Sequence, residues 1–289
     1  MDYLNAGWAL LCGLVISLGL EHPWQAHCRK HSSLVLKASI VGLGFGLNIH
    51  VLADTAANTF LITVLSIALA LICGFILMKL LCVQKETGHL ISSGTAICGG
   101  SAIAAISQSI KADNEHTTVA VTVVFLLNLA GLYLFPYLGE VLNLTEFEFG
   151  LWAALAIHDT SSVVGAAAIF GDEALKVATT TKLARALWII PLSIAYAIYA
   201  RNGESKFSIP LFIVLFVLAT IISYYFPAPS IYSVLYQIAR VLLVIALFMM
   251  GLGISRHMLR NINMRPMLMG IILWLLLALS SLSLIKWLY

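Results

Sequence analysis

The chain reads Ala156-Ile157-His158-Asp159-Thr160-Ser161-Ser162-Val163-Val164-Gly165 near the middle of an apolar run from Phe149 to Phe170. A charge in such a place is costly unless it is paired or hydrated. The polar residues His158 to Ser162 cannot all face lipid on a regular helix, so the helix breaks here or one face lines a wet cavity. Asp159 and His158 are candidate proton or cation sites, and Ser161 and Ser162 are candidate substrate ligands. A polar knot that only pins helices together is the alternative.

The composition places the chain in a lipid bilayer. Of its 289 residues, 61% are hydrophobic and 10% are charged, and the mean hydropathy is +0.99. A soluble domain is about 25% charged and about half apolar. No water-soluble fold of this size could hide so much apolar surface. These values exclude a soluble globular enzyme, a nucleic-acid binder and a disordered protein.

Ten apolar segments are expected to be helices, because backbone polar groups at membrane depth must be paired internally. They predict an all-α polytopic membrane protein with a single transmembrane transporter domain over residues 1–289. The sequence leaves open whether the fourth and sixth segments cross the membrane fully or are broken. The segments are Leu4–Leu20, Leu34–Ile49, Thr59–Leu81, Leu90–Ile110, Thr117–Leu138, Phe149–Phe170, Leu175–Tyr199, Phe207–Phe226, Val234–Ile254 and Met267–Leu288.

The distribution of Lys and Arg predicts the orientation. If all ten segments cross, one side receives nine basic residues and the other receives only Lys111, Lys176 and Lys286. The side richer in Lys and Arg is cytoplasmic, so both termini are expected outside the cytoplasm. The nine are Arg29, Lys30, Lys79, Lys85, Arg201, Lys206, Arg256, Arg260 and Arg265.

A similarity between two stretches of the sequence indicates inverted repeats. The stretch Gly44–Leu52 reads GFGLNIHVL and resembles Gly251–Leu259, which reads GLGISRHML. Each copy ends one apolar segment, and an offset of seven segments places the copies in opposite orientations. Inverted repeats of this kind underlie alternating access in many secondary transporters. Chance similarity between two glycine-rich helix ends is the alternative.

Two basic residues lie inside the seventh segment. Lys182 and Arg185 are three residues apart and so share a helix face, and both are too deep to snorkel easily. With Asp159 as the lone acid at this depth, the excess of positive charge favours an anionic substrate held by Lys182 and Arg185. The alternative is an internal ion pair between Asp159 and Arg185.

The fourth segment is rich in glycine and small hydroxyl residues, which weaken a continuous helix. A break would expose backbone N–H groups at the start of its second half, which suits an anion. Close packing through small residues is the competing explanation. The candidate substrate ligands in this segment are Thr95, Cys98, Gly99 and Ser101.

No catalytic or metal site is expected. Cys98 and His158 have no spacing typical of a nucleophile and its base, and most cysteines are small core residues. The five cysteines contain no C-x-x-C pair, so neither a disulfide framework nor a zinc site is indicated. We therefore expect no enzyme activity, no metal and no cofactor.

These motifs resemble the YeiH-type family of bacterial inner-membrane proteins over nearly the whole chain. Gly94–Ala105 is similar to the family's G-[ST]-S-I-C-G-x-[SA]-A-[IV]-x-A, and Ile157–Val164 to I-H-E-V-A-Q-V-V. Lys182, Arg185 and Pro191 fit K-x-x-R-x-x-x-L-x-P. Here Asp replaces the common Glu, Ser161-Ser162 replaces Ala-Gln, and Gly46 stands where many members carry Arg. The resemblance implies a secondary anion transporter with inverted repeats and crossed, broken helices; sulfate is a family-level label.

The leading hypothesis is a gradient-coupled transporter or exporter of a small anion, sulfate-like or an organic sulfonate or carboxylate, in the bacterial inner membrane. One alternative is a Na⁺/H⁺-type cation/proton antiporter in which Asp159 binds the cation. Another is a channel or a purely structural membrane protein. The expected partners are the anion and the lipid bilayer, with no nucleic acid and with a homodimer left open.

Overall fold

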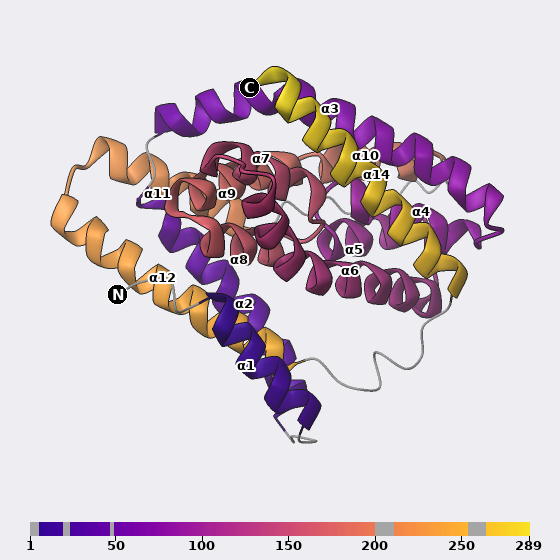
Figure 1. The fold of residues 1–289 in the computed structure, drawn as a ribbon, viewed down its shortest axis with the longest axis horizontal. Helices are drawn as coiled ribbons and strands as arrows, with labels where there is room; N and C mark the ends of the chain where they lie inside the picture. Colours follow the sequence, from indigo (N-terminus) through magenta and orange to yellow (C-terminus); the bar gives the residue numbers. More distant parts are fainter. Residues whose placement is uncertain (1–5, 20–23, 47–48, 200–210, 254–263) are drawn as a thin grey trace. The chain divides into compact units, whose positions relative to one another are not determined.

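The described residues form helices joined by short turns (Figure 1). This computed structural model describes residues 6–19, 24–46, 49–199, 211–253 and 264–289. No strand occurs in these ranges, which confirms the predicted all-α polytopic fold. Four helices are long and apolar enough to cross a membrane by length and composition: Thr59–Leu80, Glu115–Val141, Pro229–Leu252 and Met264–Leu288.

The contacts divide the chain into two compact units, each built from separate stretches of sequence. The first unit contains α1 (Ala6–Gly19), α2 (Gln25–Gly44), α11 (Leu211–Tyr225) and α12 (Pro229–Leu252). The second contains α3 (Ile49–Leu80) from Ala56 onward, α4 (Lys85–Ala96), α5 (Gly100–Ser109), α6 (Asn114–Val141), α7 (Glu146–Ala156), α8 (Thr160–Phe170), α9 (Asp172–Ala186), α10 (Ile189–Tyr199) and α14 (Met264–Leu288).

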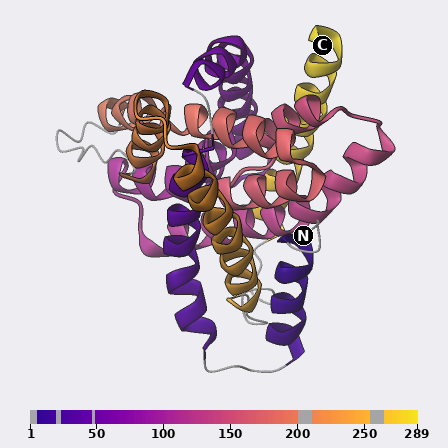
Figure 2. The ribbon, with the colours of Figure 1, turned by 90° about the vertical axis from the view of Figure 1, so that its left-hand side faces the viewer.

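In the first unit, α12 packs against both α1 and α2 (Figure 2). Small residues allow a close approach, and hydroxyl groups bond across it: Ser39 Oγ donates to the Ala239 carbonyl at 2.9 Å. Further along the pair, Phe45 stacks on Tyr232 with ring centroids 5.4 Å apart. Because the contact moves forward along α2 as it moves backward along α12, the two helices run antiparallel.

The same unit supports the predicted inverted repeat. Gly44 and Gly251 are 207 residues apart, and the same shift carries α1 onto α11 and α2 onto α12. The same shift relates two contacts between helices. In α1 and α12, a Cβ added to Gly13 would lie 3.2 Å from the Gly251 carbonyl carbon. The equivalent residues in α11 and α2 are Thr220 and Gly44, and Thr220 Oγ1 donates to the Gly44 carbonyl at 3.1 Å. Residues 47, 48 and 254–259 of the two copies lie outside the described ranges.

In the second unit, the sixth segment consists of two helices, α7 and α8, that double back on each other. Phe149 near the start of α7 stacks on Phe170 at the end of α8, with ring centroids 3.9 Å apart. Glu146, the first residue of α7, accepts a hydrogen bond from the backbone N–H of Glu173 at 2.8 Å, just after α8 ends. The two ends of the segment therefore lie together, and α7–α8 is a helical hairpin.

The fourth segment forms a second hairpin, α4–α5. Thr87 Oγ1 at the start of α4 lies 3.1 Å from His116 Nδ1 at the start of α6, so the chain returns to the same end after α5. Between the arms, a Cβ added to Gly94 of α4 would lie 2.9 Å from the Ile103 side chain of α5. The question left open by the sequence is thus answered: both segments are broken, and each doubles back.

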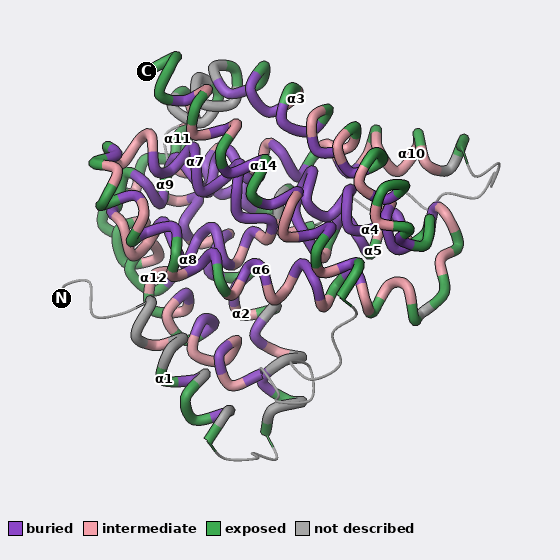
Figure 3. Tube along the Cα trace, turned by 45° about the vertical axis from the view of Figure 1, so that its right-hand side comes forward, coloured by how far each residue is buried: buried purple, intermediate pink, exposed green. Residues whose placement is uncertain are grey.

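The arms of the hairpins have half the length of a membrane crossing. The four arms contain 10 to 12 residues each, or about 15–18 Å at 1.5 Å per residue. A hydrocarbon core is about 30 Å thick, so a single arm is too short to cross it. α7 is buried from Phe149 onward, most of α8 is buried as far as Ala167, and most of α4 is buried after its first two residues (Figure 3), as irregular backbone within a membrane requires.

The seventh segment also breaks, between α9 and α10, which the sequence reading treated as one continuous segment. Pro191 explains the break, because its ring has no N–H and clashes with the carbonyl four residues earlier, that of Leu187. Tighter bonds replace the regular pattern there, such as Ile190 N–H to the Leu187 carbonyl at 3.2 Å.

We expect Gly42→Ala to destabilise the first unit. The added Cβ would lie 2.6 Å from the Ala239 Cβ, so α2 and α12 must move apart, at a cost of about 1–3 kcal/mol for overpacking. The matched control is Gly19→Ala, where no atom lies within 4 Å of the new Cβ. Thermal unfolding of the purified protein should show a lower midpoint for Gly42→Ala only. Equal midpoints for both variants would contradict this packing.

Candidate functional site

The candidate site is the place where the two hairpin tips meet inside the second unit. Gly99 at the α4–α5 tip lies against Asp159 at the α7–α8 tip: a Cβ added to Gly99 would be 3.3 Å from the Asp159 Cα. The backbone of Gly99 has φ +64°, a conformation in which glycine is favoured. The structure therefore brings together the two stretches that the sequence selected separately.

Asp159 caps the N-terminus of α8. Its Oδ2 accepts a hydrogen bond from the Ser161 backbone N–H at 3.1 Å, and the residue is half-buried. A carboxylate is stabilised at a helix N-terminus, where N–H groups are unpaired and the helix dipole is positive. The N-terminus of α8 therefore stabilises the carboxylate that the sequence places inside an apolar segment.

α5 begins at the other tip, and its N-cap residue Gly99 has no side chain to cap it; the adjacent Cys98 thiol bonds to the backbone of Ala102. Its first residues are open: a Cβ added to Gly100 would meet nothing within 4 Å, and Ser101 is exposed. Two helix N-termini thus begin at adjoining tips, and Asp159 caps one of them. The N-terminus of α5 has no charged cap, and it offers its remaining N–H groups and the Ser101 hydroxyl to a ligand.

Lys182 and Arg185 lie at the opposite ends of the half-helices, where α4 and α7 terminate. Both side chains are fully buried. Lys182 Nζ donates to the carbonyls of Ala154 at 3.1 Å and Ile157 at 2.8 Å. Carbonyl groups at a helix C-terminus lack intrahelical partners and carry partial negative charge. Lys182 therefore neutralises the end of α7.

Arg185 bonds to both hairpins. Its Nε donates to the Ala96 carbonyl at the end of α4 at 2.7 Å, and its Nη1 donates to the Leu155 carbonyl of α7 at 2.6 Å. Longer bonds reach the Thr95 carbonyl at 3.4 Å and the Ala154 carbonyl at 3.2 Å. One guanidinium group thus ties the two half-helix ends together.

The alternative of an ion pair between Asp159 and Arg185 does not hold. Within the described ranges no ion pair joins Asp159 to Lys182 or Arg185, whose bonds go to backbone carbonyls. Asp159 lies at the N-terminus of a half-helix, whereas Lys182 and Arg185 lie at the C-termini of half-helices. A direct role of Lys182 and Arg185 in binding an anion stays a prediction. An anion would have to use N–H donors that bond to hairpin carbonyls in this structure.

The other predicted residues divide between the surface of the tips and the interior. Ser161 is half-exposed, whereas Thr95, Cys98, Ser162 and His158 are buried. Thr95 Oγ1 and both ring nitrogens of His158 have no hydrogen-bond partner in the described structure, and neither do Thr179 Oγ1 and Thr181 Oγ1. Buried polar atoms are normally paired, so this interior is suited to bound water.

Sequence reasoning missed Asn128 of α6. Its Oδ1 accepts hydrogen bonds from the backbone N–H groups of both His158 and Asp159, each at 3.1 Å. These N–H groups are free because α7 has ended and α8 has not begun. The available signal was a lone amide within the apolar run of α6, and a buried amide of this kind must have a partner.

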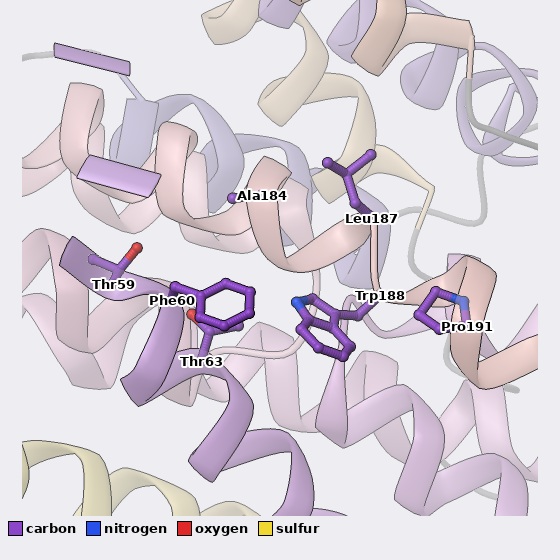
Figure 4. A pocket seen from close by; sticks show the side chains of 7 residues that line it. All are labelled: Thr59, Phe60, Thr63, Ala184, Leu187, Trp188 and Pro191. Carbon is purple, nitrogen blue, oxygen red and sulfur yellow. The ribbon is translucent and has the colours of Figure 1, made fainter. Parts of the chain in front are cut away.

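One cavity lies apart from the tips, next to the break between α9 and α10 (Figure 4). Its volume is about 340 Å³, and Phe60, Leu187, Trp188 and Pro191 give it a mainly apolar lining. Thr59 and Thr63 of α3 also line it. None of the predicted site residues lines it.

The fold and the site define a polytopic helical membrane protein with two helical hairpins that meet tip to tip. A family described as conserved hypothetical protein 698 matches residues 3–270. The chain belongs to this family of bacterial membrane proteins, which confirms the YeiH-type resemblance. No solved structure matches the chain.

Three relatives are each named UPF0324 membrane protein. The Shewanella oneidensis protein is 42% identical over 97% of this chain and 89% of its own length. The Photobacterium profundum protein is 43% identical over 98% of this chain and 87% of its own length. The Bacteroides thetaiotaomicron protein is 44% identical over 95% of this chain and 84% of its own length. These names describe membrane proteins and state no substrate.

We expect Gly99→Ala to destabilise the tips and Gly100→Ala to leave them intact. At Gly99 an L side chain must adopt φ +64°, which costs about 1–2 kcal/mol, and its Cβ would lie 3.2 Å from Val124 Cγ1. At Gly100 the new Cβ meets open space. Thermal unfolding of the two variants should separate them; a midpoint for Gly99→Ala equal to that of Gly100→Ala would refute the tip geometry.

A second test concerns the separate roles of Asp159 and Arg185. Arg185→Gln leaves buried carbonyls of both hairpins unpaired, at a cost of about 3–5 kcal/mol for a broken buried charged contact. Since Asp159 is not its partner, adding Asp159→Asn should restore neither stability nor activity. Unfolding midpoints of the two single variants and the double variant decide this. Recovery in the double variant would reinstate the ion pair.

Proposed function

We propose that the protein is a secondary transporter of a small anion, driven by an ion gradient, in the bacterial inner membrane. The observation that supports this most is the meeting of two hairpin tips beside Asp159, the one acidic residue in the interior of the apolar segments. Helix breaks near mid-membrane that present N–H groups are the recurring substrate sites of secondary transporters. The substrate passes without chemical conversion, so no catalytic residue is assigned.

The N-terminus of α5 is the proposed anion site. Its N-cap residue Gly99 has no capping side chain, its Gly100 faces open space and Ser101 is exposed. Unpaired N–H groups and the positive end of a helix dipole attract an anion. Thr95, Cys98, Gly99, Ser161 and Ser162 complete the tips around it. Lys182 and Arg185 do not contact the anion in this proposal. They fix the two hairpins through the backbone carbonyls and add positive charge near the site.

Asp159 is the proposed coupling group. Its Cα lies next to Gly99, so an ionised carboxylate there repels an anion that binds at the start of α5. Protonation of Asp159, or cation binding to it, removes this repulsion and links the anion to a proton or cation. The neighbouring imidazole of His158, whose ring nitrogens have no partner in the described structure, is the second candidate carrier.

A specific observation favours cation/proton antiport as the second candidate. The donors of Lys182 and Arg185 that an anion would use bond to hairpin carbonyls, whereas Asp159 makes no ion pair with either side chain in the described structure and is half-buried. In this case Asp159 alternately binds a proton and a cation, and the α5 N-terminus has no ligand.

Flux through proteoliposomes separates these functions. Sulfate, thiosulfate, sulfite, taurine and carboxylates are supplied under a pH or sodium gradient. Saturable uptake with counterflow supports the anion transporter. Sodium–proton exchange without an anion supports the antiporter. Unsaturable flux without counterflow supports a channel, and absence of any flux indicates a structural protein.

We expect Asp159→Asn to abolish pH-driven net anion flux and to retain anion exchange at equal pH, because exchange needs no net proton movement. Ser101→Ala should weaken apparent anion affinity several-fold. Its matched control is Ser107→Ala on the same helix, whose hydroxyl bonds to the Ala104 carbonyl at 3.0 Å. An unchanged pH profile in Asp159→Asn would transfer the coupling role to His158 or to another group.

A further inference from the structure

We propose that α4–α5 and α7–α8 are re-entrant hairpins that enter the membrane from opposite sides, α4–α5 from the cytoplasm, and that they are inverted copies of each other. This assignment concerns the path of the chain and holds whatever the protein transports. It replaces ten crossings by eight crossings and two hairpins.

The first support is the end-to-end geometry. The start of α4 and the start of α6 lie at the same end, where Thr87 Oγ1 is 3.1 Å from His116 Nδ1. At the other hairpin the end of α6, the start of α7 and the end of α8 come together. There a Cβ added to Gly139 would lie 2.6 Å from the Phe149 ring and 2.8 Å from the Phe170 ring. Since α6 crosses once between the hairpins, they must enter from opposite ends.

The second support is a repeat that hydropathy alone does not reveal. Gly99 and Asp159 are 60 residues apart, and the same shift carries α4 onto α7, α5 onto α8, and α6 onto α9–α10 to within two residues. Ala96-Ile97 and Ser101 recur as Ala156-Ile157 and Ser161. One crossing separates the two copies, so they are inverted. The equivalent residues Gly99 and Asp159 touch each other, as residues on a two-fold axis must.

The third support is the charge distribution. If the two hairpins do not cross, Lys111 moves to the side of the nine basic residues already assigned to the cytoplasm, and only Lys176 and Lys286 remain outside. The bias becomes ten to two and is sharper than with ten crossings. Both termini stay on the outer side, because two crossings are removed together.

Acidic residues gather on the outer side, opposite the basic residues of the cytoplasmic side. Five acidic residues lie close to the ends of α6 and α8: Glu140 in α6, Glu146 and Glu148 in α7, and Asp172 and Glu173 in α9. They share this side with the C-terminal end of α14, where Lys286 Nζ donates to the Leu142 carbonyl at 3.3 Å. The same end of the second unit is therefore acidic and poor in Lys and Arg.

Cysteine accessibility tests the proposal without assuming which side is cytoplasmic. Four variants each retain one cysteine in a background that lacks the others: native Cys82, Asp113→Cys, Glu140→Cys and Lys176→Cys. All four positions are exposed. Each variant is reacted with a membrane-impermeant maleimide in right-side-out and in inside-out vesicles. Labelling in detergent serves as the control for accessibility, and a monodisperse elution profile as the control for folding.

We expect Cys82 and Asp113→Cys to react from one side, the cytoplasm, and Glu140→Cys and Lys176→Cys to react from the other. Ten full crossings instead place Asp113 opposite Cys82 and Lys176 opposite Glu140. Reaction of either pair from opposite sides overturns the proposal. A short epitope inserted after Ala112 of the otherwise unchanged chain gives a second measurement, in case the cysteine-free background does not fold. Antibody binding from outside intact cells would equally overturn it.

These outcomes are distinct from failure of the proposed transport. A protein that moves no anion and still labels as expected retains the hairpin topology. Flux without the expected labelling retains the transporter and loses the inverted hairpins.

Discussion

The arrangement of the second unit depends on one buried guanidinium group that bonds to backbone carbonyls. A helix that stops inside a bilayer leaves carbonyls without partners, and lipid cannot pair them. Arg185 supplies partners to two such ends at once, the Ala96 carbonyl of α4 and the Leu155 carbonyl of α7. Burial of the guanidinium charge is costly, but removal of the Arg185 side chain would leave the carbonyls at both helix ends unpaired, which costs more. The hairpins can end inside the membrane because this side chain is there.

The charges follow the polarity of the half-helices. Lys182 and Arg185 lie where α4 and α7 end, and Asp159 lies where α8 begins. Each charge therefore stabilises a partial charge of opposite sign, and the interior needs no direct ion pair. This arrangement leaves the start of α5 as a helix terminus at the tips without a charged cap. In the proposed function an anion binds at that point and supplies the charge of opposite sign.

Local sequence predicted the breaks but could not predict the path of the chain. Gly99 and the polar stretch around Asp159 both indicate interrupted helices, and the structure has interruptions at both places. An apolar run of about 22 residues is long enough for one crossing, yet two arms of half that length contain the same residues, so hydropathy cannot distinguish them. The deciding contacts, Phe149 with Phe170 and Thr87 with His116, join positions that only the fold brings together. For the same reason the partners of Arg185 were unknowable: a carbonyl has no signature in the sequence.

The two hairpins are related by a repeat, but they are held unequally. Six hydrogen bonds fix the end of α7 and the α7–α8 tip: Lys182 and Arg185 donate four of them, and Asn128 Oδ1 accepts two. Two bonds from Arg185 fix the end of α4. The shift of 60 residues explains the difference, because the positions equivalent to Lys182 and Arg185 are Thr122 and Phe125. In the proposed transporter, movement of α4–α5 therefore breaks fewer of these bonds than movement of α7–α8, and its tip carries the helix N-terminus that begins after Gly99, while α7–α8 keeps Asp159 in a fixed position.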